Sequence, residues 1–166
     1  MRAVRKLHIQ PLDIDKRSEV KKKIMNEAVT VVLSIKPHWW ELIKSGKKTV
    51  EFRSTKPRVA ENLKVYIYAT SPTRKVVGEF YCPFIGSSEF TNSDTATNER
   101  ILEGTCLSEE EAMNYLRLPR EIGIGSKPRN KSCFLWKIKD LVVYDKPREL
   151  KDFISYTPQS WGYVRD

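Results

Sequence analysis

Three charged side chains that could do chemistry lie close together within residues 46–53: Lys48, Glu51 and Arg53. Side chains of a strand alternate between two faces, so a strand here places Glu51 and Arg53 on one face with Thr49. A carboxylate beside a guanidinium and an ammonium group can hold a phosphate or exchange protons with a ligand. The same pattern also occurs on half-exposed edge strands, where a surface ion pair contributes little to stability.

The elements around this segment predict how a site forms. Residues 29–35 are a β-branched run that suits a buried strand. Residues 37–45 begin with proline and end before Gly46, as expected of a short helix with a glycine just past its end. The order strand, helix, glycine turn, strand brings Ser34 and Lys36 near the charged strand. We therefore expect a small polar cleft between a helix and a sheet.

The pattern Gly46-x-Lys48-x-x-Glu51-x-Arg53 resembles the signature of the ASCH domain, a relative of the PUA RNA-binding fold. The stretches at 33–37 and 158–164 are also similar to segments of bacterial and phage members. The resemblance implies an α+β fold, namely a PUA-like small β-barrel of mostly antiparallel strands with helices flanking a polar cleft. It divides the chain into a basic N-terminal extension over residues 1–28 and an ASCH domain over residues 29–166.

The N-terminal extension carries eight basic and four acidic side chains, so four positive charges remain. Asp13 or Asp15 is suited to cap a helix that runs to about Asn26. Two interpretations stay open: a basic arm that contacts phosphates, and a solvated extension without a partner, which the thin apolar stripe favours. The whole chain of 166 residues has a net charge of +9. That charge suits an anionic partner such as nucleic acid.

The rest of the chain predicts further elements in an order that does not alternate regularly between helix and strand, which excludes a doubly wound sheet. These elements are strands over 63–70 and 75–82, a helix over 108–118, a strand over 132–144 and a helical turn over 147–153. The first two strands form a hairpin. Ser108 and Glu111 form a capping box at the start of the helix. Residues 86–105 predict the longest irregular connection, and 119–130 a basic loop with glycines.

Cysteine spacing and hydropathy predict the cellular setting. Cys82, Cys106 and Cys133 are odd in number and widely spaced, which favours a reducing compartment over a disulfide framework. No apolar run approaches the roughly 18 residues that span a membrane, so we expect a cytoplasmic protein without a membrane partner. His8 and His38 lack cysteines or carboxylates at metal-binding spacing. We expect neither a metal nor a cofactor.

The first functional hypothesis is a module that binds RNA, or a nucleotide or nucleoside, in the cleft. The residues expected at the binding site are Ser34, Lys36, Trp39, Lys47, Lys48, Glu51, Arg53, Gln159, Ser160 and Trp161. The cations would hold phosphates and a tryptophan would stack on a base, although every tryptophan also suits a core position. Gln159 and Ser160 offer groups that read a base edge. The resemblance implies the same role, RNA binding in translation or transcription control.

The second hypothesis, an amidohydrolase, rests on the resemblance. Some small bacterial ASCH proteins deacetylate N4-acetylcytidine with the motif lysine, a threonine and a glutamate. Lys48 matches that lysine and would act as base or nucleophile if burial, Lys47 or Arg53 favoured its neutral form. Glu51 occupies the position of the hydrolase threonine, so that role does not transfer by position. Thr49 is the candidate substitute, and Glu51 the candidate acid–base group.

The third hypothesis is a metal-independent ribonuclease, an activity associated with some ASCH relatives. Such cleavage needs a general base for the 2′-hydroxyl and a cation that stabilises the phosphorane. Lys48 and Arg53 supply the charge, but neither histidine is placed as the base. This hypothesis therefore ranks behind the other two.

Overall fold

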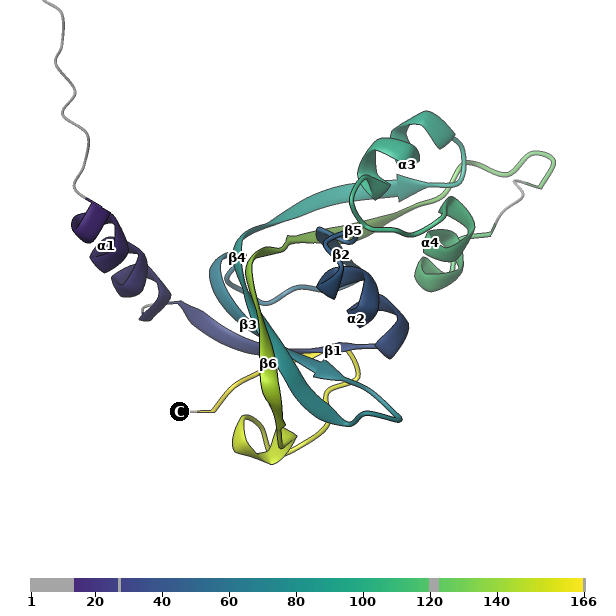
Figure 1. Cartoon of the computed structure of the whole chain (residues 1–166). Coiled ribbons are helices and arrows are strands. Elements are labelled where there is room, and N and C mark those ends of the chain that lie inside the picture. Colours follow the sequence, from purple (N-terminus) through teal and green to yellow (C-terminus); the bar gives the residue numbers. More distant parts are fainter. Residues whose placement is uncertain (1–13, 27, 120–122, 166) are drawn as a thin grey trace, which may run out of the picture.

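The computed structural model describes residues 14–26, 28–119 and 123–165 (Figure 1). Helices and strands mix without regular alternation, which is the α+β class that the sequence predicts. In chain order the elements are α1 (Ile14–Asn26), β1 (Val29–Ile35), α2 (Pro37–Lys44), β2 (Val50–Arg53), β3 (Glu61–Ala69), β4 (Lys75–Thr91), α3 (Thr95–Leu102), α4 (Glu109–Leu116), β5 (Asn130–Lys137), β6 (Lys139–Arg148), a 3-10 helix (Leu150–Asp152) and β7 (Trp161–Tyr163).

Seven strands form one sheet in the order β2-β5-β4-β3-β1-β7, and β6 pairs with β4 beside this path. Only β1 and β3 pair in parallel; the other pairs of described strands are antiparallel. The long strand β4 joins the two halves, because its first part pairs with β3 and β6 and its second part with β5. Within the described sheet, β2 and β7 lie at the two ends of this order and do not pair with each other. The sheet is therefore not closed, and the expected barrel is not confirmed.

The main core lies between the sheet and α2. Leu33 on β1 stands opposite Ile67 on β3, and both are completely buried. Trp40 and Ile43 project from the same face of α2 into this cluster. Burying an apolar side chain of this size stabilises the fold by about 1.5–3 kcal/mol. Figure 1 shows α3 and α4 at one end of β4 and β5, where they cover a second apolar cluster.

Most predicted elements are present. The helix after residue 36, the hairpin of β3 with β4 and the helical turn near 150 are confirmed. Helix α4 begins with the predicted capping box, in which Glu111 N–H donates to Ser108 Oγ and Ser108 N–H donates to Glu111. The predicted strand over 132–144 is divided at Ile138 into β5 and β6, and Asp140, the second residue of β6, adopts a left-handed backbone (φ 50°). The three residues of β7 carry too short a pattern to be predicted.

The predicted irregular connection over 86–105 is wrong. Strand β4 continues to Thr91 because residues 85–91 pair with β5, and this pairing overrides their polar composition. Helix α3 follows at once, capped by Asp94, whose side chain accepts a hydrogen bond from Thr97 N–H. Within the basic loop predicted over 119–130, residues 123–129 form no helix or strand.

Helix α1 confirms the predicted N-terminal helix. Figure 1 shows it just before β1, projecting from one end of the sheet, where it contacts β3. Lys21 pairs with Asp140 at 3.0 Å and connects it to the start of β6. Asp13 and His8, considered above as a cap and as a metal ligand, lie outside the described residues. Among the helices that the structure describes, none combines the length and apolar character needed to cross a bilayer.

Candidate functional site

The turn after α2 delivers Lys48 to the interior. Gly46 adopts φ +79°, a left-handed conformation that favours glycine, and its N–H donates to Ile43 O at 3.0 Å. Lys48 N–H then donates to Leu42 O at 3.0 Å and turns the chain back toward the helix. As a result the Lys48 side chain is only 2% exposed.

Lys48, Glu51 and Arg53 form a buried charged network. Lys48 Nζ lies 3.2 Å from Glu51 Oε2, and Arg53 Nε lies 2.9 Å from Glu51 Oε1. Lys48 Nζ also donates to Thr105 O at 2.6 Å and lies 5.1 Å from the centre of the Trp39 ring. The ammonium group is thus engaged by a carboxylate, a carbonyl and an aromatic face.

Arg53 connects β2 to the other end of the open sheet. Its Nη2 donates to Ser34 O at 2.5 Å, and its Nη1 donates to Ser160 Oγ at 3.3 Å. Ser34 in turn donates from its hydroxyl to Pro158 O at 2.6 Å and from its N–H to Ser160 O at 2.9 Å. Side chains therefore span the gap between β2 and β7 that strand pairing leaves open.

The network has an incomplete set of partners. It contains two cations and one anion, so positive charge remains in a buried region, where an unpaired charge is costly. Glu51 Oε2 accepts no hydrogen bond from the described residues, although Lys48 lies within ion-pair distance of it. Glu51 lines the cavity described next, and the surplus positive charge of the network can receive an electronegative group.

A cavity of about 260 Å³ opens above this network. Its walls come from β1, α2, β2, α4 and the segments beside α4 and β7. The lining residues are Ser34, Lys36, Trp39, Lys48, Glu51, Phe52, Arg53, Thr70, Leu107, Tyr115 and Gln159. Sites for drug-sized molecules begin at roughly 300 Å³, so this cavity suits a group somewhat smaller than a typical drug molecule.

The structure brings most of the predicted site residues together. Those that line the cavity are Ser34, Lys36, Trp39, Lys48, Glu51, Arg53 and Gln159. Ser160 touches the network through Arg53 without lining the cavity. Lys47 is exposed outside it. Trp161 packs against Trp136 with ring centres 6.4 Å apart and donates to Thr55 Oγ1, so it braces the sheet edge instead.

Thr49 does not share the face of Glu51, and that expected placement is wrong. Thr49 N–H and Val50 N–H both donate to Gly104 O, so β2 begins only at Val50 and regular alternation does not reach residue 49. A Cβ atom at Gly104 would lie 2.6 Å from Thr49 Oγ1, which shows how closely this side chain packs there. Thr49 lines a separate hollow of about 410 Å³ beside α3, turned away from Lys48.

Sequence reasoning missed the wall formed by residues 105–115. Thr105 accepts a hydrogen bond from Lys48 across 57 positions of the chain, and Leu107 lines the cavity. Tyr115 lines it from α4, with its ring 5.9 Å from Phe52 in an edge-on arrangement. Only the α4 capping box was visible in the sequence, and it carries no information about which strand the helix faces.

The free thiols lie apart from the cavity. Burial raises the pKa of Cys82 to about 12 and that of Cys133 to about 11. Cys106 is exposed. No group of three or more His, Cys, Asp or Glu side chains suited to a metal ion occurs within the described ranges of the chain.

The motif, the fold and the cavity agree with the family that matches the sequence. This chain belongs to the ASCH domain family, whose model matches residues 33–156. Membership supports a PUA-like fold for the open sheet described above.

Individual relatives refine this placement. The chain is 46% identical over 50 residues to an ASCH domain-containing ribonuclease of Zymomonas mobilis; the match covers 30% of this chain and 34% of that relative, about a third of its length. The crystal structure of ASCH from Zymomonas mobilis is similar at a TM-score of 0.64 with 26% identity, covering 82% of this chain and 87% of that one. The N-terminal domain of Staphylothermus marinus McrB shares the fold at a TM-score of 0.50 and 13% identity, covering 85% of this chain and 91% of that one.

Proposed function

We propose that this protein binds single-stranded RNA by taking one nucleotide into the cavity above Lys48, Glu51 and Arg53. The observation that carries the proposal is the buried, positively charged network beneath a cavity of about 260 Å³. Sequence-specific RNA recognition commonly uses unstacked bases held by aromatic rings and hydrogen bonds to base edges. Three parts of such a site support the proposal: aromatic rings that stack on a base, polar groups that reach a base edge, and a cation that contacts a phosphate.

Aromatic rings supply the first part. Trp39 from α2 and Tyr115 from α4 both line the cavity and both keep part of their surface exposed. A base that enters between these elements can stack on an aromatic ring, an interaction worth about 1–3 kcal/mol per base. Stacking tolerates any base, so it supplies affinity more than sequence preference.

Polar groups supply the second and third parts. Glu51 lines the cavity as a possible hydrogen-bond acceptor for a base, and Gln159 offers both a donor and an acceptor at the wall. Lys36 is exposed at the cavity and makes no ion pair with any described residue, so it is free to contact a phosphate. The buried network then orients the base, while the exposed cation holds the backbone.

Ribonuclease activity is a second candidate, favoured by the name of the Zymomonas mobilis relative. In that reaction the 2′-oxygen of the nucleotide attacks the adjacent phosphorus, its proton passes to a base, and the bond to the 5′-oxygen breaks. Lys36, Lys48 and Arg53 are the cations at the cavity that can offset the charge of the phosphorane. Glu51 is the carboxylate at the cavity that can receive the proton.

Deacetylation of N4-acetylcytidine has less support. A lysine nucleophile or base needs a free amine, whereas Lys48 is engaged by Glu51, Thr105 O and the Trp39 ring. The threonine proposed to assist it, Thr49, faces another hollow. The site therefore fits ligand binding better than this hydrolysis.

Binding of a short, fluorescently labelled single-stranded RNA tests the proposal. Trp39→Ala should raise Kd about 5- to 150-fold, the equivalent of one lost stacking interaction. Phe84→Ala is the matched control, because Phe84 is an exposed aromatic residue on β4 that does not line the cavity. Equal Kd values for the two variants and the wild type would contradict the proposal.

Mass spectrometry of the same mixtures separates the candidates. Intact RNA indicates a binding module, and fragments ending in a cyclic phosphate indicate a ribonuclease. Acetate released from added N4-acetylcytidine would indicate an amidohydrolase. Lys36→Gln, a change at an exposed residue, should abolish cleavage if cleavage occurs, whereas Lys47→Gln should not.

A further inference from the structure

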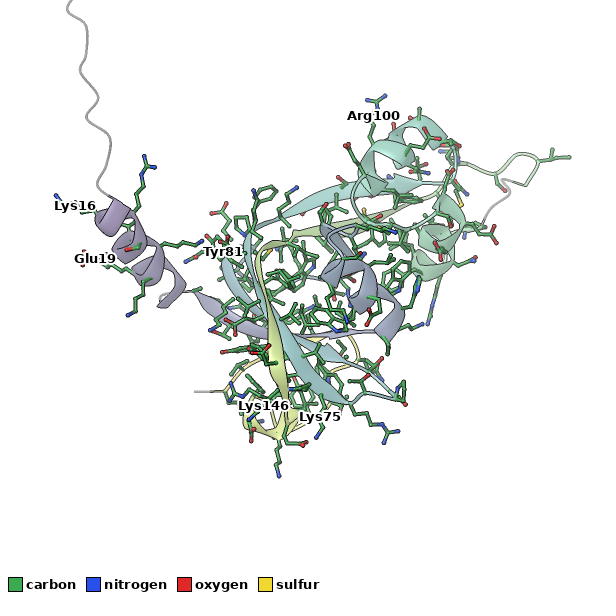
Figure 2. The ribbon with its side chains drawn as sticks, in the orientation of Figure 1. Lys16, Glu19, Lys75, Tyr81, Arg100 and Lys146 are labelled. Carbon is green, nitrogen blue, oxygen red and sulfur yellow. The ribbon has the colours of Figure 1, made fainter. Side chains whose placement is uncertain are left out.

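Helix α1 presents a concentration of positive charge outside the cavity. Its five cations are exposed, against Asp15 and Glu19 as the acidic residues of the helix; they are Lys16, Arg17, Lys21, Lys22 and Lys23. Lys21 is held by Asp140, whereas the other four make no ion pair with described residues. Figure 2 shows Lys16 and Glu19 extending from α1 away from the rest of the protein.

Packing against the sheet does not account for this helix. Val20, an apolar residue in its middle, is 55% exposed. A helix of 13 residues is marginal in water without tertiary support. Arg17 and Lys21 lie four residues apart, the spacing at which like charges on a helix repel each other. An anionic partner would relieve that repulsion and stabilise the helix.

A chain of contacts connects α1 with the cavity. Lys21 pairs with Asp140 at the start of β6, and Lys139 precedes Asp140 on the surface. Ile138 N–H, one residue earlier, donates to Thr49 O at 3.0 Å. Thr49 directly follows Lys48 of the buried network. The exposed side chain of Lys139 adds a further positive charge beside the Lys21–Asp140 pair.

We propose that α1 is an electrostatic arm that binds phosphates of the same RNA strand whose nucleotide occupies the cavity. This inference rests on the proposed function and extends it from a single nucleotide to an oligonucleotide. Lys and Arg side chains that neutralise phosphates release counterions, which gives affinity without sequence preference and makes it dependent on salt. The cavity then supplies selection and the arm supplies salt-dependent affinity.

The geometry sets the ligand length. From Val29, just after α1, to Ser34 at the cavity, β1 covers about 17 Å, at about 3.3 Å per residue. A free nucleoside cannot reach both places. A strand of several nucleotides can, so the arm affects RNA binding and leaves nucleoside binding unchanged.

The test compares two variants of the full chain with equal charge loss. The arm variant carries Lys16→Gln, Arg17→Gln and Lys23→Gln, which keeps good helix formers and leaves the Lys21–Asp140 pair intact. The control variant carries Arg74→Gln, Lys146→Gln and Lys151→Gln, all exposed and remote from α1. Kd for a short single-stranded RNA is measured at several salt concentrations, beside Kd for a nucleoside.

We expect the slope of log Kd against log salt to fall by about 2 in the arm variant, since each phosphate contact to single-stranded RNA contributes about 0.7. The control variant should keep the wild-type slope, and nucleoside binding should not change in either. Equal slopes for arm and control variants overturn the inference and leave the proposed function standing. A changed slope together with no effect of Trp39→Ala supports the arm and contradicts the cavity. Loss of binding to phosphatidylserine–phosphatidylcholine vesicles, with RNA binding unchanged, identifies a membrane arm and overturns the inference.

Discussion

Two regions of this protein are almost equally buried and have opposite chemistry. Under β1 and β3, apolar side chains such as Leu33 and Ile67 fill the core completely. Next to Ser34 of the same strand β1, Lys48, Glu51 and Arg53 are 2%, 6% and 8% exposed, yet all three carry charge. The first region needs only shape and volume to be stable. The second needs each charge matched by a partner at a defined distance.

This difference indicates which region is organised for a ligand. Burying ions costs several kcal/mol each before their mutual attraction is counted, and apolar residues of the same volume often stabilise a fold as well or better. The apolar region is complete in itself. The charged region keeps a surplus cation and a carboxylate oxygen without a described hydrogen bond, next to a cavity. We infer that the remaining partner is the ligand.

The largest expected effect comes from removing the anion of the charged region. Glu51→Ala leaves Lys48 and Arg53 buried without their carboxylate, and the free energy of unfolding should fall by about 3–5 kcal/mol. Glu41→Ala breaks an exposed helical pair with Lys44 and should cost less than about 0.5 kcal/mol. Urea denaturation measures both. Similar losses in the two variants would mean that the network is not desolvated as described.

A change at the cavity wall should affect binding more than stability. Tyr115 is 43% exposed, so Tyr115→Ala should lower the free energy of unfolding only by about 0.5–1.5 kcal/mol, the worth of its edge-on contact with Phe52. The same variant should raise Kd for single-stranded RNA about 5- to 150-fold, because it removes one stacking surface. Tyr115→Phe keeps the ring and should retain most of the affinity. If Tyr115→Ala bound single-stranded RNA with the Kd of the wild type, α4 would not be part of the binding site.

Alkaline pH should weaken the apolar region through its buried thiol. Burial raises the pKa of Cys82 from 9.0 to about 12, so the folded protein keeps this proton to higher pH than the unfolded chain. The contribution is fully present below about pH 9 and is lost between about pH 9 and 12, at up to about 1.4 kcal/mol per pH unit. Urea midpoints at about pH 8 and about pH 10 measure the slope. Cys82→Ala should make the dependence of the urea midpoint on pH shallower. An unchanged slope in that variant would assign the dependence to other groups.

The smallest expected effect comes from a change inside the apolar region. Ile67→Val removes one buried methylene group and should cost about 0.5–1.5 kcal/mol. RNA affinity should stay within about twofold of the wild type, because this site needs only volume and lies outside the cavity lining. Calorimetric melting and RNA titration of the same preparation give both quantities. A large loss of affinity would show that the two regions are coupled.

The two regions also differ in how far the sequence predicts them. The strand over 29–35 follows from its β-branched run, the strand over 63–70 from local alternation, and the charged motif from residues 46–53 alone. What fails depends on distant partners. Gly104 O captures the N–H groups of Thr49 and Val50, and pairing with β5 extends β4 through a polar segment. Tyr115 reaches the cavity only because α4 packs beside β2, which no local pattern encodes.

The most direct measurement is the indole N–H spectrum of the four tryptophans during titration with a short single-stranded RNA. The account predicts a large shift of the Trp39 signal, assigned with Trp39→Phe, because its ring lines the cavity. The signal of Trp136, which is completely buried in the core, should stay in place. RNA binding that leaves the Trp39 signal unmoved would contradict the claim that a nucleotide enters this cavity.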